Sequence, residues 1–216
     1  LEFWEYVQRA RRKPLVAFPA DGPDQDSTNN LLYDFSQVPI PTDDVDPEQV
    51  AKPRPWSVGE IARFILLIGP CSSIFDYTTY AMMWFIFKCN NLGLMPPPEL
   101  AEYFARASLT NPDSTYAAAL FQTGWFVESL LTQTLIIHVI RTNKVPFIQS
   151  RASWPLIVTS GAIMLVGTWL PFSPIGVWLG FVPLPFLYWP LLVITLLLYV
   201  LLTQGVKMWL VRKLWI

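Results

Sequence analysis

An apolar run over residues 117–140 limits what this chain can fold into. A helix needs about 20 apolar residues to cross a bilayer, and this run supplies them, with one carboxylate, Glu128, near its middle. A basic turn over residues 141–151 follows directly, and a second apolar run begins at Trp154. This pattern predicts a membrane-spanning helix that ends in a cationic loop.

Three further runs have the same character and cover residues 61–87, 154–172 and 186–206. In the first, Gly69-Pro70 is expected to kink the helix, because proline lacks an N–H and clashes with the preceding turn. In 154–172, Gly161 and Gly167 are expected to allow close helix approach. The sequence therefore predicts an all-α, polytopic membrane helix bundle with four full transmembrane helices.

The composition agrees with a membrane protein and excludes several other classes. The 216 residues are 53% hydrophobic and only 14% charged, well below the roughly 25% of an average soluble domain. A net charge of −1 gives no field that would attract nucleic acid, so no such partner is expected. Two cysteines and one histidine are too few for a disulfide framework or a zinc site.

The remaining segments are polar or short. Residues 1–13 suit either a surface-lying amphipathic helix or a solvated terminus, and 19–28 have the composition of a linker. Residues 29–41 form an apolar segment too short to span, 42–57 a polar loop, 88–116 a long loop, and 173–185 an uncharged, proline-rich hairpin. The chain begins with Leu rather than Met, which is consistent with a fragment.

Lys and Arg are distributed unequally between the two sides of the predicted bundle. One side holds eight of them, and the other holds only Lys88 and Arg106; the eight are Lys52, Arg54, Arg141, Lys144, Arg151, Lys207, Arg212 and Lys213. Because positive loops stay in the cytoplasm, both termini are predicted there and 88–116 outside.

Two carboxylates at similar depth are the candidate functional groups. Asp76 forms a polar stripe with Ser72 and Thr79 in the first span, and Glu128 has Thr132 one turn away. Carboxylate and hydroxyl oxygens suit magnesium or calcium, and intramembrane carboxylates often mark ion paths. The alternative is a neutral carboxyl that is hydrogen-bonded to a neighbouring helix.

Other polar residues favour a structural interpretation. His138, near the cytoplasmic end of its span, is expected to be an interfacial hydrogen-bonding residue, and Gln122 and Gln133 to join helices. No phosphate-binding GxxxxGK[ST] loop or aspartyl-phosphate motif occurs in the chain.

Taken together, several stretches resemble the C-terminal membrane region of magnesium-transporting P-type ATPases. The resemblance runs from about residue 29 to residue 206, in one order, and excludes residues 1–28. The stretches are NNLLYDFSQ (29–37), KPRPW (52–56), GPCSSIFDYTTYAMMWFIF (69–87), FQTGWFVESLLTQTLIIHVIRTNKVPFIQSRASWP (121–155) and LPFSPIG (170–176).

The resemblance implies a specific place for each segment. The family has ten transmembrane helices and couples ATP hydrolysis to cation movement through a phosphorylated aspartate. Residues 29–57 would hold the cytoplasmic half of the sixth helix and a loop, and 58–216 the seventh to tenth helices. Asp34 would be a carboxylate ligand and Asn30 a carbonyl ligand for the transported magnesium. The remaining family ligands, the nucleotide site and the phosphorylation site lie in parts that this chain lacks.

Three functions follow as hypotheses. The first is a transport component, the membrane-domain part of a magnesium pump in the plasma membrane, active only with a separate catalytic half; whether it counts as an enzyme is left open. The second is a pump remnant or structural membrane protein that packs against other helices. The third, a small cation channel using Asp76 and Glu128, is disfavoured because four such helices offer few polar positions for a pore.

Overall fold

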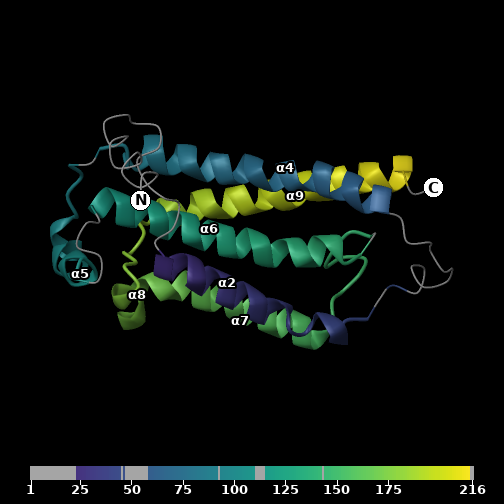
Figure 1. The fold of residues 1–216 in the computed structure, drawn as a ribbon, viewed down its shortest axis with the longest axis horizontal. Coiled ribbons are helices and arrows are strands. Elements are labelled where there is room, and N and C mark those ends of the chain that lie inside the picture. The colour runs from purple at the N-terminus through teal and green to yellow at the C-terminus, as the bar shows by residue number, and fades with distance from the viewer. Residues whose placement is uncertain are drawn as a thin grey trace.

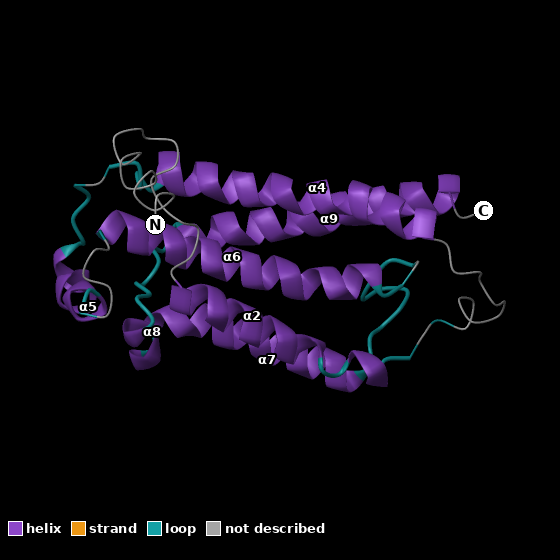
Figure 2. Ribbon diagram, viewed as in Figure 1, coloured by secondary structure: helices purple, strands orange, loops and turns teal. Residues whose placement is uncertain are grey.

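A computed structural model describes residues 23–44, 46, 58–91, 93–109, 115–142 and 144–214. The described part is helical and contains no β-strand (Figure 2). The sequence-based interpretations of residues 1–22 and 47–57 fall outside it. Five long helices carry the structure: α2 (Pro23–Gln37), α4 (Val58–Ala81), α6 (Tyr116–Ile140), α7 (Trp154–Trp169) and α9 (Tyr188–Leu214). The short elements are η2 (Ile40–Thr42), η3 (Met82–Ile86), η4 (Pro98–Leu100), α5 (Ala101–Ala107), η5 (Leu170–Phe172) and α8 (Pro174–Trp178).

Helix α6 is the centre of the bundle. The long helices run lengthwise beside one another, with α4 against α9 and α2 against α7, and α6 contacts all four (Figure 1). Almost every side chain of α6 is buried, whereas α7 and α9 each leave a broad apolar face exposed. The N-terminus of α6 is capped by Thr115, whose hydroxyl oxygen accepts the backbone N–H of Ala118.

Within the part of the chain that the structure describes, three helices are long and apolar enough to cross a membrane: Tyr116–Ile140, Trp154–Phe172 and Tyr188–Arg212. They coincide closely with three of the four predicted spans. Helix α4 occupies most of the fourth, 61–87, but is not among these three, so the count of four spans remains a prediction. Helix α4 continues through Pro70 from Val58 to Ala81, and a π-helical turn, η3, follows it.

The linker interpretation of residues 23–28 was wrong, because α2 begins at Pro23. Pro23 suits the first turn of a helix. Asp24 and Asp26 follow in that turn, where their negative charges interact favourably with the positive end of the helix dipole. Tertiary contact adds to this: the side-chain amide of Gln25 donates to the carbonyl of Leu179, 3.3 Å away. This polar segment is thus helical because it packs against the rest of the bundle, as the Gln25–Leu179 hydrogen bond shows.

Short helices also interrupt two segments that were expected to be irregular. The long loop 88–116 contains α5, and the hairpin 173–185 contains α8. Tyr103 of α5 joins them, since its hydroxyl lies 2.8 Å from the carbonyl oxygen of Pro171 and 3.1 Å from that of Ser173. The loops at this end of the bundle therefore form one packed layer.

Of the two glycines expected to permit close helix approach, only Gly167 does so. A Cβ at Gly167 would lie 2.3 Å from the Leu130 side chain of α6, whereas one at Gly161 would meet nothing within 4 Å. Gly124 of α6 also permits a close approach, because a Cβ added there would lie 2.8 Å from the Met83 side chain. The hydroxyl of Tyr188 donates to the carbonyl of Gly124 at 2.6 Å.

Candidate functional site

Glu128 is the most unusual polar group in the described chain. It lies on α6, is 0% exposed, and neither carboxylate oxygen has a hydrogen-bond partner among the described residues. Burying a polar group without a partner costs several kcal/mol (about 2–7). The alternative of a carboxyl hydrogen-bonded to a neighbouring helix is therefore not what the described part of the structure shows.

The surroundings of Glu128 come from α4 and α9. Asp76 of α4 is close enough to interact electrostatically with it, and so are Tyr188 and Tyr199 of α9. The sequence placed the two carboxylates at similar depth, and in the structure Asp76 lies near enough for its charge to act on Glu128.

The hydroxyl groups near the Glu128 carboxylate differ in their hydrogen bonding. Thr132 was expected to share a face with Glu128, but its hydroxyl donates to the backbone carbonyls of Glu128 and Ser129 at 3.0 Å. Thr79 of α4 is buried, and its hydroxyl has no partner among the described residues. Ser72 is hydrogen-bonded to Tyr199. The polar stripe on α4 therefore faces the interior in part.

Asn30 and Asp34, unlike Glu128, lie on the surface of the bundle. Both are exposed on α2, one helical turn apart and so on one face. The other face of α2 is buried: the side-chain amide of Asn29 donates to the hydroxyl of Ser129 on α6 at 3.3 Å, and Ser36 is buried too. The candidate ligands therefore point away from the bundle, separate from the buried Glu128.

No group of three or more His, Cys, Asp or Glu side chains in the described residues comes together in a way that could hold a metal ion. The four candidate residues thus lie in two separate places: the exposed pair on α2, and the buried Glu128 of α6 with the half-buried Asp76 of α4.

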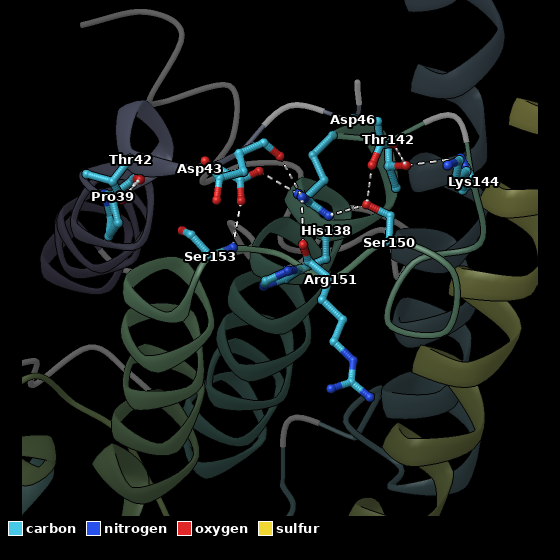
Figure 3. A network of polar contacts seen from close by, with 12 residues as sticks. Pro39, Thr42, Asp43, Asp46, His138, Thr142, Lys144, Ser150, Arg151 and Ser153 are labelled. Carbon is cyan, nitrogen blue, oxygen red and sulfur yellow. Dashed lines mark hydrogen bonds and ion pairs between the residues drawn. The ribbon is translucent and has the colours of Figure 1, made fainter. Parts of the chain in front are cut away.

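A second polar region lies at one end of the bundle and was missed in the sequence (Figure 3). Asp43 follows α2 and η2 in the chain. One of its carboxylate oxygens accepts a hydrogen bond from the guanidinium Nε of Arg141, 2.5 Å away. Its other oxygen accepts the backbone N–H of Ser153 at 2.7 Å. Arg141 is the C-cap of α6 and Ser153 the N-cap of α7, so one carboxylate joins the ends of two helices.

Arg141 uses its whole guanidinium in this region. Besides Asp43, it donates to the hydroxyl of Ser150 at 3.1 Å and to the backbone carbonyls of Asp44 and Arg151 at 3.3 and 3.0 Å. The side chains of Arg141 and Asp43 are only 9% and 12% exposed. Planar arginine is well suited to such a multiply bonded position.

Asp46 binds the α6–α7 loop (residues 141–153) beside Arg141. It accepts the hydroxyls of Thr142 and Ser150, the latter at 2.7 Å. These two hydrogen bonds lower the pKa of the Asp46 carboxyl, assisted by the positive charges of Lys144 and Arg141. With its pKa lowered, Asp46 stays ionised to a more acidic pH than an ordinary aspartate.

Helix α9 reaches the same loop through Lys207. Its ammonium group is buried and donates to the carbonyls of Val139, Thr142 and Lys144 at 2.9, 3.1 and 3.0 Å. Gln204, one turn earlier, donates to the carbonyl of Lys144 at 3.3 Å. Carbonyls at the C-terminus of a helix are favourable partners for a cation.

The hydrogen bond expected of His138 is confirmed, while its location at the membrane interface stays a prediction. Its Nε2 lies 2.8 Å from the hydroxyl oxygen of Ser160, which joins α6 to α7. Gln133, expected to join helices, instead donates within α6 to the hydroxyl of Ser129 at 2.8 Å. A signal for the network itself was present in the sequence, because the acidic 43–46 segment and the basic turn 141–151 have opposite charge.

Comparison with known proteins yields a consistent result. A family model described as "Cation transporting ATPase, C-terminus" matches residues 28–209. The chain is 47% identical over 184 residues, 85% of its length, to "Magnesium-transporting ATPase, P-type 1" of Salmonella typhimurium strain LT2. It is 47% identical over 178 residues to the protein of the same name from Escherichia coli strain K12. The matched regions cover only 18% and 17% of those two proteins.

Proposed function

The chain belongs to the cation-transporting ATPase family, in the C-terminal region of its members, and from this we propose that it serves as the C-terminal membrane domain of a magnesium pump. The observation that carries the proposal is the match over residues 28–209 together with relatives named as magnesium-transporting ATPases. The helical, apolar bundle supports it, since such helices satisfy their own backbone groups within a bilayer.

Within such a pump, Asn30 and Asp34 would be ligands of the transported magnesium. Their exposure on one face of α2 supports this, because the ligands from the rest of the pump need an open side on which to meet them. Magnesium prefers oxygen ligands such as carboxylates and carbonyls. Asp76 and Glu128 would act as intramembrane carboxylates along the ion path.

The membrane arrangement belongs to the same proposal. Helices α4, α6, α7 and α9 would be four spans of one bundle, with α2 as part of a fifth. The excess of Lys and Arg at the end containing Arg141 and Lys207 supports a cytoplasmic location for that end, which also holds the C-terminal end of α9. The start of α2 lies at the opposite end of the bundle, where the Gln25 amide donates to the carbonyl of Leu179, so the proposal does not extend to a cytoplasmic N-terminus. The plasma membrane is the proposed location.

ATP hydrolysis would be carried out by a catalytic half. The chain corresponds to less than a fifth of the relatives' length, so we assign it no nucleotide site. Its contribution would be to hold the ligand face and to support the moving helices of the pump.

Magnesium uptake in magnesium-starved cells tests this function. The chain would be expressed alone and together with a catalytic half that ends before the helix corresponding to α2. We expect rescue of growth only by the pair, and its loss in Asp34→Asn. Asp26→Asn is the matched control, since Asp26 is also an exposed aspartate of α2. Rescue by the chain alone would refute the pump-domain function, and absence of rescue by the pair would leave a structural role.

A second candidate, a small cation channel, is favoured by one observation, the unpartnered Glu128 carboxylate. Conductance of the purified chain in liposomes tests it. A channel requires a current that Glu128→Gln abolishes, and a silent wild-type chain excludes it.

A further inference from the structure

We propose that Asp43, Asp46 and Arg141 form a latch that fixes the C-terminal end of α2 on the α6–α7 loop and thereby positions the Asn30–Asp34 face. That this face binds magnesium rests on the proposed function. The latch itself is a matter of contacts between side chains and helix ends, and these can be measured independently.

The first argument is the way in which Asp43 uses its carboxylate. One oxygen is bound by Arg141 at 2.5 Å and the other by the Ser153 backbone N–H at 2.7 Å. The Ser153 side chain makes no capping hydrogen bond of its own, so Asp43 supplies an acceptor to the N-terminus of α7 from a distant part of the sequence. Both carboxylate oxygens of Asp43 therefore take part in joining the ends of α6 and α7.

The second argument is that the pair is nearly enclosed. With side chains 9% and 12% exposed, the charges are poorly hydrated, and removing one partner leaves the other buried without compensation. An exposed ion pair offers a contrast in the same chain: Glu102 and Arg106 on α5 are 81% and 68% exposed. Such surface pairs contribute little to stability.

The third argument is that the latch closes on a fixed platform. The Ser150 hydroxyl accepts a hydrogen bond from Arg141 and donates one to Asp46, so Arg141 and Asp46 meet through one hydroxyl. Asp43 is joined to them through Arg141. Lys207 holds the carbonyls of the same loop from α9. Because α6, α7 and α9 are joined at this point, α2 is attached to three helices rather than to one.

The fourth argument is the short connection between the latch and α2. The Thr42 backbone N–H and hydroxyl both bond to the carbonyl of Pro39, at 2.9 and 2.7 Å, and the N–H of Asp43 donates to Ile40 at 3.0 Å. This hydrogen-bonded turn leaves little slack between α2 and Asp43. A change at the latch is therefore transmitted to α2 and to the face that carries Asp34.

Spin-label distances test the latch directly in the complete chain reconstituted in nanodiscs. Labels at Leu31→Cys on α2 and Val158→Cys on α7 occupy exposed positions, in a background where Cys71 and Cys89 are replaced by Ala. We expect one narrow distance distribution in the parent. In Asp43→Asn, a second, longer distance should appear. The matched control is Asp44→Asn, because Asp44 contacts Arg141 only through its backbone carbonyl.

The consequence for magnesium is tested in the pump reassembled with its catalytic half. For a positioning residue, we expect Asp43→Asn to raise the half-saturating magnesium concentration about tenfold while the maximal rate stays within about twofold, because the loss falls on binding. The conservative Asp43→Glu should retain most of the affinity, and Asp44→Asn should match the parent.

Two results would overturn the proposal. One is a distance distribution for Asp43→Asn that equals that of Asp44→Asn, which would show that the contacts do not hold α2. The other is a longer distance without any change in half-saturation, which would make the latch structural only. If the reassembled parent moves no magnesium, the proposed function fails, and the spin-label distances alone decide whether the latch exists.

Discussion

Replacing Lys207 with Met should loosen the end of the bundle at which four helices meet. The Lys207 side chain is 3% exposed and its ammonium group donates to three carbonyls of α6 and the following loop, at 2.9–3.1 Å. Met has a similar length and an apolar body but no donor. The substitution therefore removes three hydrogen bonds with little change in packing volume.

The expected loss follows from two opposing terms. Hydrogen bonds to a charged group contribute about 1.5–3 kcal/mol each, so three would give roughly 4.5–9 kcal/mol. Burying the ammonium group costs several kcal/mol, and that cost disappears in the variant. Polar contacts within membrane bundles are also weaker, about 0.6 kcal/mol on average. We therefore expect a net loss of about 2 kcal/mol, or about 4–8 °C in Tm for a chain of this size.

Thermal unfolding of the purified chain in detergent, followed by tryptophan fluorescence, measures this loss. Arg212→Met is the matched control, because Arg212 is a cation of the same helix that lies exposed. Lys207→Arg should restore part of the stability, since it keeps the charge. A Tm for Lys207→Met equal to that of Arg212→Met would refute the view that the buried ammonium group holds the loop.

Three other predictions concern separate parts of the chain. Gly176→Ala should lower Tm, because its Cβ would lie 2.1 Å from the backbone oxygen of Leu170, while Gly161→Ala, which meets nothing within 4 Å, should not. The pKa of Asp46 is lowered in the folded chain, so ionised Asp46 stabilises the fold above the usual aspartate pKa of about 3.9, and this stabilisation is lost as the pH falls below that value. In unfolding experiments at pH 3–6, the Asp46→Asn variant should therefore lack this part of the pH dependence. Cys89 is fully buried, and burial raises its pKa to about 12, so maleimide should label it far more slowly than a cysteine at the exposed position of Leu109 until detergent denaturation.

Hydrophobicity was sufficient to locate the three most apolar of the long helices, α6, α7 and α9. The predicted span 154–172 coincides with Trp154–Phe172, and 117–140 differs from Tyr116–Ile140 by one residue. These agree because an uninterrupted apolar run has few alternatives in a membrane protein. The helical state of 23–28 could not be predicted in the same way, since the local composition favours a turn and the packing partner, Leu179, is distant in sequence.

Pairing between distant segments was the part that the sequence could not supply. The acidic residues of 43–46 and the basic turn 141–151 were both evident, but Asp43 and Arg141 are 98 positions apart. Which carboxylate meets which cation depends on the way that α2 lies against α7. The two glycines of α7 make the same point, because only the neighbouring Leu130 distinguishes Gly167 from Gly161.

The two pairs of candidate ligands call for different explanations. On α6 itself, the buried hydroxyls of Thr132 and Thr134 donate to backbone carbonyls. The Glu128 carboxylate is left without such a partner, although a Gln or Leu at this position would avoid the cost of burying an acid. An intramembrane carboxylate is a functional-site hypothesis by default, so our proposal for Glu128 is that it binds a proton or a cation. Asn30 and Asp34, by contrast, are exposed and pay no such cost, so their use depends on what covers α2. Substitutions of the buried Glu128 and the half-buried Asp76 therefore test what this chain does by itself. Substitutions of the exposed Asn30 and Asp34 test what it does when the rest of a pump is present.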